Sequence, residues 1–396
     1  MTGVVLKFGG SSVATTDKIK DVCKLILKKK DEYDSVIVVV SAMGKTTNNL
    51  ISLADELTEE PNSRDMDMLL NTGEMVSASL MSIYLNSINQ DTVALTGFQA
   101  GFRTTGEHSK SRIDNIDTER LENELSDGKI IIVTGFQGMN ENGDLTTLGR
   151  GGSDTSAVAI AASLGFNCEI YTDVKGIYTV DPRIRSKAKK LECITYEETM
   201  EMANLGAKVI EPRSVEMAEK YSVPLYIALN TGDIPGTHIK TEVENLEKSS
   251  ITNISNLDGR LLVNITEEAG EESRIIECFA KLADNNINVD IISHSIDREG
   301  NPITSFTSTV DNMSKISRML TDMNLNHRFT SEVSKVSIIG TAMRNQVGVA
   351  ARAFNVFLNE NIKFYEVSTS EISISYVVDS DNAIKIVNAL ADEFNL

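Results

Sequence analysis

Residues 6–12 read Leu6-Lys7-Phe8-Gly9-Gly10-Ser11-Ser12, behind the apolar run 4–6 and ahead of a stretch with helical spacing. This order predicts a strand, a glycine turn and a helix. Two adjacent glycines can adopt positive φ, so that successive N–H groups point into one concavity that suits a phosphate group. Lys7, just before the turn, is placed to neutralise a phosphoryl group in transfer. The turn is not a Walker A motif, and on its own it is equally consistent with an ordinary tight turn beside a surface lysine.

The composition indicates a folded protein of two or three domains, with 396 residues of which 41% are apolar. A formal net charge of −19 opposes nucleic acid or an anionic membrane as the main partner. The four cysteines form no C-x-x-C pair, so neither a disulfide framework nor a zinc site is indicated. We find no signal peptide and no apolar run of about 20 residues, the length that a membrane span needs. We therefore expect a cytoplasmic protein with no nucleic-acid or membrane partner.

Strands and helices alternate through the first part of the chain. The β-branched run Val36–Val40 predicts a strand buried on both faces of a parallel sheet. Ligands bind beyond the carboxyl ends of such strands, so the polar segment Ser41–Thr47 is either a binding loop or an ordinary polar loop. A helical pattern over Asp65–Leu85 carries Glu74 among apolar residues. Glu74 is either a solvated charge or the partner of a ligand ammonium group.

A second glycine turn, Leu148-Gly149-Arg150-Gly151-Gly152-Ser153-Asp154, opens a helix of small apolar residues. The planar guanidinium of Arg150 suits a carboxylate or a phosphate, and Asp154 is able to orient either a lysine or a metal ion. Residues 169–183 then combine hydrogen-bond acceptors, aromatic rings and cations, a mixture typical of a nucleotide site. Two such glycine turns in one domain favour phosphate binding over a purely structural role.

Together these motifs resemble those of the aspartate kinases of the amino acid kinase superfamily, in family order and over the whole chain. The resemblance implies an α/β fold in which an αβα sandwich surrounds a mostly parallel sheet, with ATP and L-aspartate in line across its carboxyl edge. It implies phosphoryl transfer to the side-chain carboxylate of L-aspartate, which gives 4-phospho-L-aspartate, the first step toward lysine, threonine and methionine. A carboxylate is already a nucleophile at neutral pH, so no general base is required.

The resemblance also assigns roles to individual residues. Lys7 and Asp154 would be catalytic, with Lys7 on the γ-phosphoryl group. Arg150 would bind the α-carboxylate of aspartate and Glu74 its α-ammonium group. ATP would be contacted by Lys7, Phe8, Gly9, Gly10, Thr172, Asp173, Tyr178, Asp181, Arg183 and Lys208. Aspartate would be contacted by Ser41, Thr47, Glu74, Arg150, Gly151 and Ser153. Mg²⁺ would enter with the nucleotide, and no metal site made by the protein alone is expected.

The domains expected are a catalytic domain at 1–240, a polar linker at 241–258, and two similar modules at 259–330 and 331–396. The modules form an internal repeat, in which Phe279 corresponds to Phe354 and Asn286-Ile287 to Asn361-Ile362. They resemble paired ACT domains, ferredoxin-like βαββαβ units that bind amino acids, and imply feedback by lysine or threonine or both. The alternative is a duplicated ferredoxin-like domain that only dimerises. ACT pairing implies a homodimer or tetramer, and the candidate effector contacts are Asn288, Asp290, Ser293 and Ser368.

Some positions depart from the family pattern. The usual Pro-Gly turn before the first helix of each ACT unit is replaced by Ala269-Gly270 and by Gln346-Val347-Gly348, and His294-Ser295 stands where some relatives carry Gln-Asn. The identity of the effector therefore stays open. Two alternatives to an aspartate kinase are a superfamily kinase acting on glutamate, carbamate or a nucleoside monophosphate, and a catalytically silent amino-acid sensor. The intact motifs around Lys7 and Arg150 oppose the second.

Overall fold

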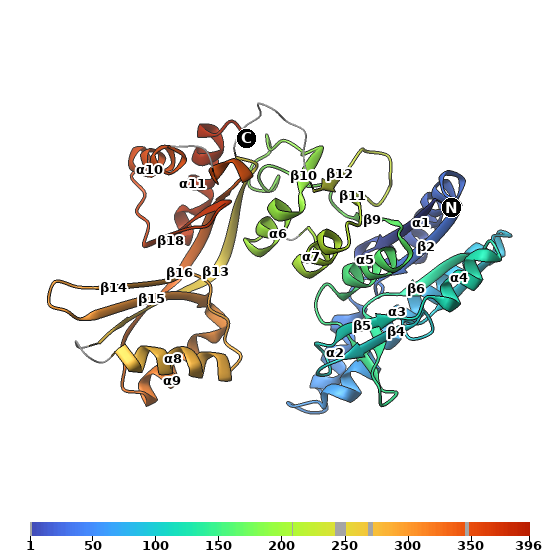
Figure 1. The fold of residues 1–396 in the computed structure, drawn as a ribbon, viewed down its shortest axis with the longest axis horizontal. Coiled ribbons are helices and arrows are strands. Elements are labelled where there is room, and N and C mark those ends of the chain that lie inside the picture. The colour runs from blue at the N-terminus through green and yellow to red at the C-terminus, as the bar shows by residue number, and fades with distance from the viewer. Residues whose placement is uncertain (1, 208, 242–250, 268–271, 345–347) are drawn as a thin grey trace. The chain divides into compact units, whose positions relative to one another are not determined.

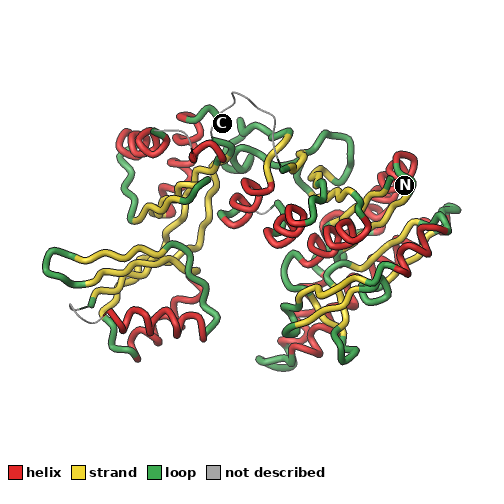
Figure 2. Tube along the Cα trace, in the orientation of Figure 1, coloured by secondary structure: helices red, strands yellow, loops and turns green. Residues whose placement is uncertain are grey.

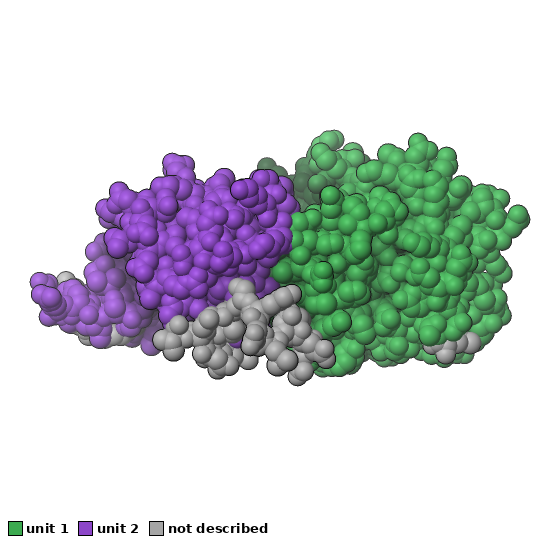
Figure 3. All heavy atoms as spheres, turned by 90° about the horizontal axis from the view of Figure 1, so that it is seen from above, with its two compact units in different colours: residues 1–178, 190–203, 208–246 green, residues 179–189, 204–207, 247–396 purple. Residues whose placement is uncertain are grey.

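The computed structural model describes residues 2–207, 209–241, 251–267, 272–344 and 348–396. The chain divides into two compact units, shown in two colours in Figure 3. The first comprises residues 1–178, 190–203 and 208–246, and the second residues 179–189, 204–207 and 247–396. No helix of the described residues is both long and apolar enough to cross a membrane.

An eight-stranded sheet forms the centre of the first unit, in the order β10-β12-β11-β9-β1-β2-β6-β3 (Figure 1). The strands are β1 (Gly3–Phe8), β2 (Ser35–Val40), β3 (Thr92–Leu95), β6 (Ile130–Thr134), β9 (Asn167–Thr172), β10 (Cys193–Thr195), β11 (Leu225–Leu229) and β12 (Thr237–Lys240). All pairings from β11 to β3 are parallel, whereas β12 runs antiparallel to β11. The predicted mostly parallel sheet is confirmed.

Helices cover both faces of this sheet. On one face, α1 (Thr16–Glu32) and α3 (Ser63–Ser87) pack on the alternate β1 side chains Val4, Leu6 and Phe8. Because successive side chains of a strand point to opposite faces, Lys7 lies on the other face, where α5 (Gly152–Leu164) packs against β1 and α7 (Pro212–Lys220) packs against α5. The remaining helices of this unit are α2 (Thr46–Asp55), α4 (Glu119–Ser126) and α6 (Tyr196–Asn204).

A second, smaller sheet of four short strands was not predicted from the sequence. Its order is β5-β4-β7-β8, visible as short yellow segments in Figure 2. The strands are β4 (Phe102–Thr105), β5 (Arg112–Ile116), β7 (Gln137–Met139) and β8 (Leu145–Thr147). β8 leads directly into the second glycine turn and α5, so this sheet fixes where that turn begins.

A six-stranded antiparallel sheet, in the order β14-β15-β13-β16-β18-β17, forms the centre of the second unit. Its strands are β13 (Asn253–Thr266), β14 (Ile292–Ile296), β15 (Pro302–Thr309), β16 (Asn326–Ile339), β17 (Glu366–Thr369) and β18 (Ser373–Asp379), and its helices are α8 (Glu272–Asp284), α9 (Met313–Asp322), α10 (Val349–Asn359) and α11 (Ser380–Glu393). α8 and α9 share a core with β13 and β15, and α10 and α11 share one with β16 and β18.

The two modules share their longest strands. The second half of β13 pairs with β15 and with the start of β16, whereas Asn253–Leu257 pairs with Lys335–Ile339 of the second module. Among its described residues the second module therefore has no fourth strand after α11, and the start of β13 takes that place. The expectation of a linker through residue 258 is wrong from residue 253 onward. The sequence did not predict this strand, because its Asn and Ser residues are typical of a polar loop. In the structure the Asn253 side chain is nevertheless buried, and it donates to the Thr179 carbonyl at 3.1 Å.

Candidate active site

The carboxyl ends of five parallel strands, β1, β2, β6, β9 and β11, lie at one edge of the main sheet. Most of the polar segments singled out from the sequence follow these ends: the first glycine turn follows β1, Ser41–Thr47 follows β2, and Asp173 follows β9. Ligands of open parallel sheets bind at this edge. The fold thus gathers at one place residues that are far apart in the sequence.

Lys7 and Asp154 form an ion pair. The Lys7 Nζ and Asp154 Oδ1 atoms are 2.5 Å apart, and the two side chains are only 12% and 11% exposed. Lys7 reaches this position from β1, and Asp154 from the first turn of α5. Of the two roles that the sequence left open for Asp154, this ion pair favours the orientation of a lysine. An ammonium group held in a largely dry position interacts more strongly with a nearby phosphate than one in water does.

The first glycine turn differs from its prediction in its backbone. Gly9 has a φ of −72°, and residues 10–13 form a 3₁₀ turn, so neither glycine adopts positive φ. Close approach is what requires glycine at position 10, because a Cβ there would lie 2.6 Å from the Ala42 carbonyl oxygen. The Gly44 N–H donates to the Gly10 carbonyl at 3.0 Å. The turn after β1 and the loop after β2 are therefore packed backbone to backbone.

Glu74 is buried, with 4% exposure, and its Oε1 accepts from the Ala42 N–H at 3.1 Å. Burial raises the pKa of Glu74 to about 7. Gly73 permits this contact, since a Cβ there would lie 2.9 Å from the Ala42 Cβ. Within the part of the chain that the structure describes, Glu74 Oε2 is buried without a hydrogen-bond partner. Glu74 is therefore not the solvated charge that the sequence left possible, and its second oxygen is available to a ligand.

The other predicted aspartate contacts after β2 are Ser41 and Thr47, both half-buried. The Ser41 N–H donates to the Phe8 carbonyl at 3.2 Å, and the Ser77 hydroxyl of α3 donates to the Ser41 carbonyl at 2.8 Å. Thr47 lies in the first turn of α2. This loop is consequently fixed between β1 and α3.

In the second glycine turn, unlike the first, two glycines adopt positive φ. Gly149 and Gly151 have φ of +77° and +65°, and Ser153 is buried in the first turn of α5. Arg150 lies between these glycines and is exposed. A Cβ on Gly151 would lie 2.5 Å from the Glu211 side chain, so this carboxylate covers the turn. Burial and the neighbouring Asp154 raise the pKa of Glu211. The sequence analysis did not identify Glu211.

The predicted nucleotide contacts are divided between the two units. Thr172 and Asp173 lie at the end of β9, where the Thr172 hydroxyl donates to the Asp173 carboxylate at 3.1 Å. Tyr178, also in the first unit, forms an isolated antiparallel β-bridge with Lys190 through the backbone. Asp181 and Arg183 belong to the second unit and pair with each other at 2.6 Å, which lowers the pKa of Asp181. Lys208, like residues 269–270 and 346–347 of the departures noted above, lies outside the described residues.

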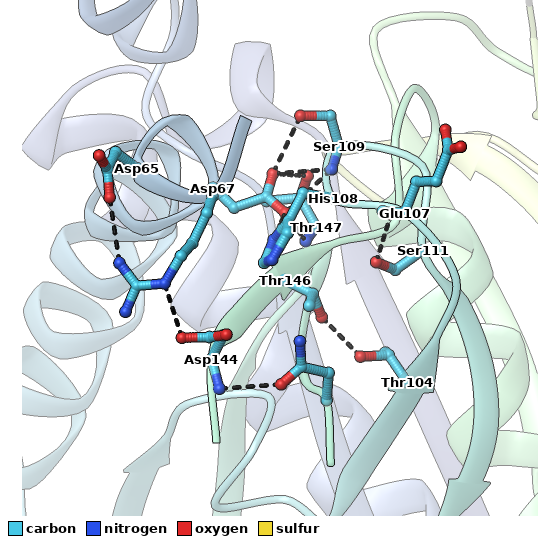
Figure 4. A network of polar contacts seen from close by, with 12 residues as sticks. Asp65, Asp67, Thr104, Glu107, His108, Ser109, Ser111, Asp144, Thr146 and Thr147 are labelled. Carbon is cyan, nitrogen blue, oxygen red and sulfur yellow. Dashed lines mark hydrogen bonds and ion pairs between the residues drawn. The ribbon is translucent and has the colours of Figure 1, made fainter. Parts of the chain in front are cut away.

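Sequence reasoning missed Asp67, a fully buried carboxylate on α3 that accepts hydrogen bonds from His108, Ser109 and Thr147 (Figure 4). A single acid in a helical pattern gave no signal, because its partners lie 41 to 80 residues further on. Residues 2–207, 209–241, 251–267, 272–344 and 348–396 contain no group of three or more His, Cys, Asp or Glu side chains arranged to hold a metal ion.

The candidate effector residues do not converge within one chain. Asn288 and Asp290 precede β14 and are exposed, and Ser293 lies on β14 itself. Ser368 lies on β17, the strand at the opposite edge of the same sheet. The Asp290 carboxylate accepts from Lys335 and lies 3.3 Å from Arg260.

Comparisons with known proteins cover nearly the whole chain. The model of the amino acid kinase family matches residues 2–229, and an ACT domain model matches residues 336–394. Aspartokinase 2 of Bacillus subtilis is 43% identical, covering 99% of this chain and 98% of its own. E. coli aspartokinase III with aspartate and ADP (R-state) has a TM-score of 0.83 at 24% identity, over 99% of this chain and 100% of that one. Its lysine and aspartate complex (T-state) has a TM-score of 0.78 at 24% identity, over 99% of each chain.

Proposed function

Because the chain belongs to the aspartokinases of the amino acid kinase family, we propose that Lys7, Glu74 and Arg150 are the side chains that carry its phosphoryl transfer. An aspartokinase transfers the γ-phosphoryl group of ATP to the side-chain carboxylate of L-aspartate, which gives 4-phospho-L-aspartate and ADP. This is the activity of the chain, as an enzyme of amino-acid biosynthesis. The roles of the residues rest on the resemblance to the family, and the geometry of the described residues supports them.

The observation that carries the assignment for aspartate is the free oxygen of Glu74. A buried carboxylate with an unpartnered oxygen in the described chain needs a donor, and the α-ammonium group of aspartate supplies one. Arg150, exposed between two glycines, takes the α-carboxylate with its planar guanidinium. Ser41, Thr47, Gly151 and Ser153 complete the set. Two of the three polar groups of aspartate are then held, and its side-chain carboxylate is left to attack the γ-phosphorus.

Lys7 supplies the charge stabilisation. Phosphoryl transfer needs alignment and neutralisation of charge more than it needs proton transfer, and the nucleophile here is already ionised. Asp154 keeps the Lys7 ammonium at the edge of the sheet, beside Gly9, whose Cβ position would lie 3.6 Å from Nζ. The open side of Gly9 leaves room for the phosphoryl group beside the ammonium. Asp154 thus acts through Lys7.

For the nucleotide, we assign Phe8, Gly9 and Gly10 to the phosphates, and Thr172, Asp173, Tyr178, Asp181, Arg183 and Lys208 to the rest of ATP. ADP is bound in the R-state structure of E. coli aspartokinase III. Mg²⁺ enters with the nucleotide and reduces the negative charge of its phosphates. A cytoplasmic location agrees with the four free cysteines.

The second unit is proposed to be the regulatory part. Two ACT modules, at about 259–330 and 331–396, would bind lysine, as the T-state structure of E. coli aspartokinase III contains lysine. Ser293 and Ser368 lie on the opposite edge strands of the sheet, so a site that used both would need two chains. This supports a homodimer with effector sites between copies.

Hydroxamate trapping tests the activity and its regulation together. The purified chain is incubated with ATP, Mg²⁺ and hydroxylamine, with aspartate or glutamate as acceptor, and then with lysine, threonine or both. Product from aspartate alone, suppressed by lysine, is the expected result. Product from glutamate at a comparable rate contradicts the assignment of the acceptor site. Activity that no amino acid suppresses contradicts the regulatory role and leaves the kinase intact.

A further inference from the structure

Asp67 carries a carboxylate that is fully buried in the first unit, with a side chain that is 0% exposed. Its Oδ1 accepts from the Thr147 hydroxyl at 2.6 Å and from the Ser109 hydroxyl at 3.3 Å. Its Oδ2 accepts from the N–H groups of Ser109 at 2.9 Å and Thr147 at 3.1 Å, and lies 3.0 Å from His108 Nδ1. Burial of an ionised carboxylate costs free energy unless hydrogen-bond donors compensate it, and here two distant segments supply the donors (Figure 4).

These donors connect α3 to the turn that carries Arg150. Thr147 is the last residue of β8, three positions before Arg150. Ser109 also supports the turn directly, since its carbonyl oxygen lies 3.2 Å from where a Cβ on Gly149 would stand. The Ser111 N–H donates to the Thr147 carbonyl at 3.0 Å. A shift of β8 relative to α3 would therefore break several contacts of Asp67 at once.

The same helix carries Glu74, two turns after Asp67. Residues seven apart lie on one face of a helix, about 10 Å along its axis. Helix α3 thus carries Glu74 itself, and through Asp67 it also fixes the end of β8, which leads to Arg150. On the proposed function, these two side chains bind the ammonium and carboxylate groups on the same carbon atom of aspartate, so their separation must be fixed closely.

We propose that Asp67 is a positioning residue for aspartate, which sets the place of Arg150 relative to Glu74 without touching the substrate. This inference rests on the proposed roles of Glu74 and Arg150. Loss of an Asp67 contact should weaken aspartate binding, because the turn is then free to move away from Glu74. ATP binding should change little, since none of the described residues assigned to the nucleotide is among the hydrogen-bond partners of Asp67.

Adjacent residues of β8 provide a matched pair of variants. Thr147→Val removes the hydroxyl that donates to Asp67. Thr146→Val removes a hydroxyl from the other face of the strand, where Thr146 bonds Thr104 at 2.6 Å in an equally buried position. We expect Thr147→Val to raise the KM for aspartate about tenfold, in the range that small misplacements cause. We expect Thr146→Val to leave it within twofold, and both variants to keep the KM for ATP.

Asp67→Asn is the stronger second variant, because an amide presents N–H groups to donors. It should raise the KM for aspartate more than Thr147→Val does, with the melting temperature and circular dichroism recorded for each protein. A lower melting temperature with unchanged KM values would show a merely structural role and overturn the proposal. So would equal effects of the two threonine variants, or equal rises in both KM values. If the wild-type chain formed no hydroxamate from aspartate, the proposed function would fail first, and separately.

Discussion

Lys7 is the residue on which turnover should depend most directly. Its ammonium is held by Asp154 beside the open face of Gly9. We expect Lys7→Ala to lower kcat by about a thousandfold, as removal of a preorganised stabilising group does, while aspartate still binds. Steady-state kinetics and aspartate titration check this. Lys18→Ala is the control, because the exposed Lys18 side chain donates to the Ser11 carbonyl of the same turn. If Lys7→Ala kept more than a tenth of the wild-type kcat, the role assigned to Lys7 would be wrong.

The burial of Glu74 predicts a pH dependence. Its pKa is raised to about 7, so the carboxylate that would bind an ammonium group becomes protonated as the pH falls below that value. The KM for aspartate should therefore rise below about pH 7 in the wild type. In Glu74→Gln the KM should be high at every pH, because no charge remains to titrate. Initial rates from pH 5.5 to 8.5 measure this, and a wild-type KM that is flat with pH would remove Glu74 from the substrate site.

The raised pKa of Glu74 also predicts how the stability of the fold depends on pH. A carboxyl whose pKa is higher in the folded than in the unfolded chain stabilises the fold at low pH, and this contribution is lost as the pH rises through the folded pKa. The melting temperature of the wild type should thus fall relative to that of Glu74→Gln between pH 5 and pH 8. This comparison needs no substrate, so it tests the burial of Glu74 apart from its proposed role.

At the scale of elements, the structure of the turn after β1 predicts different effects for alanine at Gly9 and at Gly10, whereas the sequence predicts similar ones. Positive φ at both glycines would make Gly9→Ala and Gly10→Ala similarly harmful. In the structure only Gly10 faces backbone, with the Ala42 carbonyl 2.6 Å from a Cβ, whereas Gly9 has a φ that alanine adopts easily. We expect Gly10→Ala to lower the free energy of unfolding by about 1–3 kcal/mol. Denaturant titration should show little change for Gly9→Ala, and equal losses would restore the conformational explanation.

The start of β13 provides a second test at this scale. Ile254 is 1% exposed and packs in the core of the second module. Ile254→Ala should destabilise the second unit by about 2–4 kcal/mol, because it leaves a cavity in a packed core. Thermal unfolding followed by calorimetry measures this. A true linker would tolerate the change without any shift of the transition.

The sequence predicted the elements whose burial leaves a pattern in consecutive residues, and it missed those that depend on contacts with distant residues. Val36–Val40 is a continuous apolar run, and the sequence predicts a strand there because burial on both faces leaves that pattern. β8 has three residues, and the strand at Asn253 is polar, so neither shows a periodic pattern. The role of Asp67 could not be predicted either, because its hydrogen-bond partners His108, Ser109 and Thr147 are far from it in the sequence. The assigned roles at the carboxyl edge stay predictions, although the fold that gathers those residues is confirmed.

At the scale of the whole molecule, the net charge of −19 contrasts with two anionic substrates. Binding must then depend on local cations, because long-range attraction has the wrong sign. Lys7 and Arg150 are the cations that we place nearest the reacting groups, and each is fixed by a glycine turn or an ion pair. On these proposed assignments, two residues and the contacts that hold them, rather than the overall charge, would determine the chemistry of the chain.

The exposed edge strand β14 of the regulatory sheet predicts that the chain forms a homodimer. β14 is an edge strand, and Ile292 and Ile296 on it are 53% and 62% exposed. An exposed apolar edge pairs readily with another chain, and a second copy offers the same edge. We expect light scattering to give twice the chain mass of 43.3 kDa for the wild type, and the single mass for Ile296→Lys.

Lysine inhibition should be lost with the dimer while basal turnover remains, since Ser293 and Ser368, which we propose as effector contacts, lie on opposite edges of the sheet in one chain. Ile276→Lys is the matched control, because Ile276 is 73% exposed but lies on α8 rather than at the edge. If Ile276→Lys also dissociated the protein, the interface would involve the helices and the edge model would be wrong. If Ile296→Lys remained dimeric, β14 would not be the contact. A monomer that lysine still inhibits would place the whole effector site within one chain.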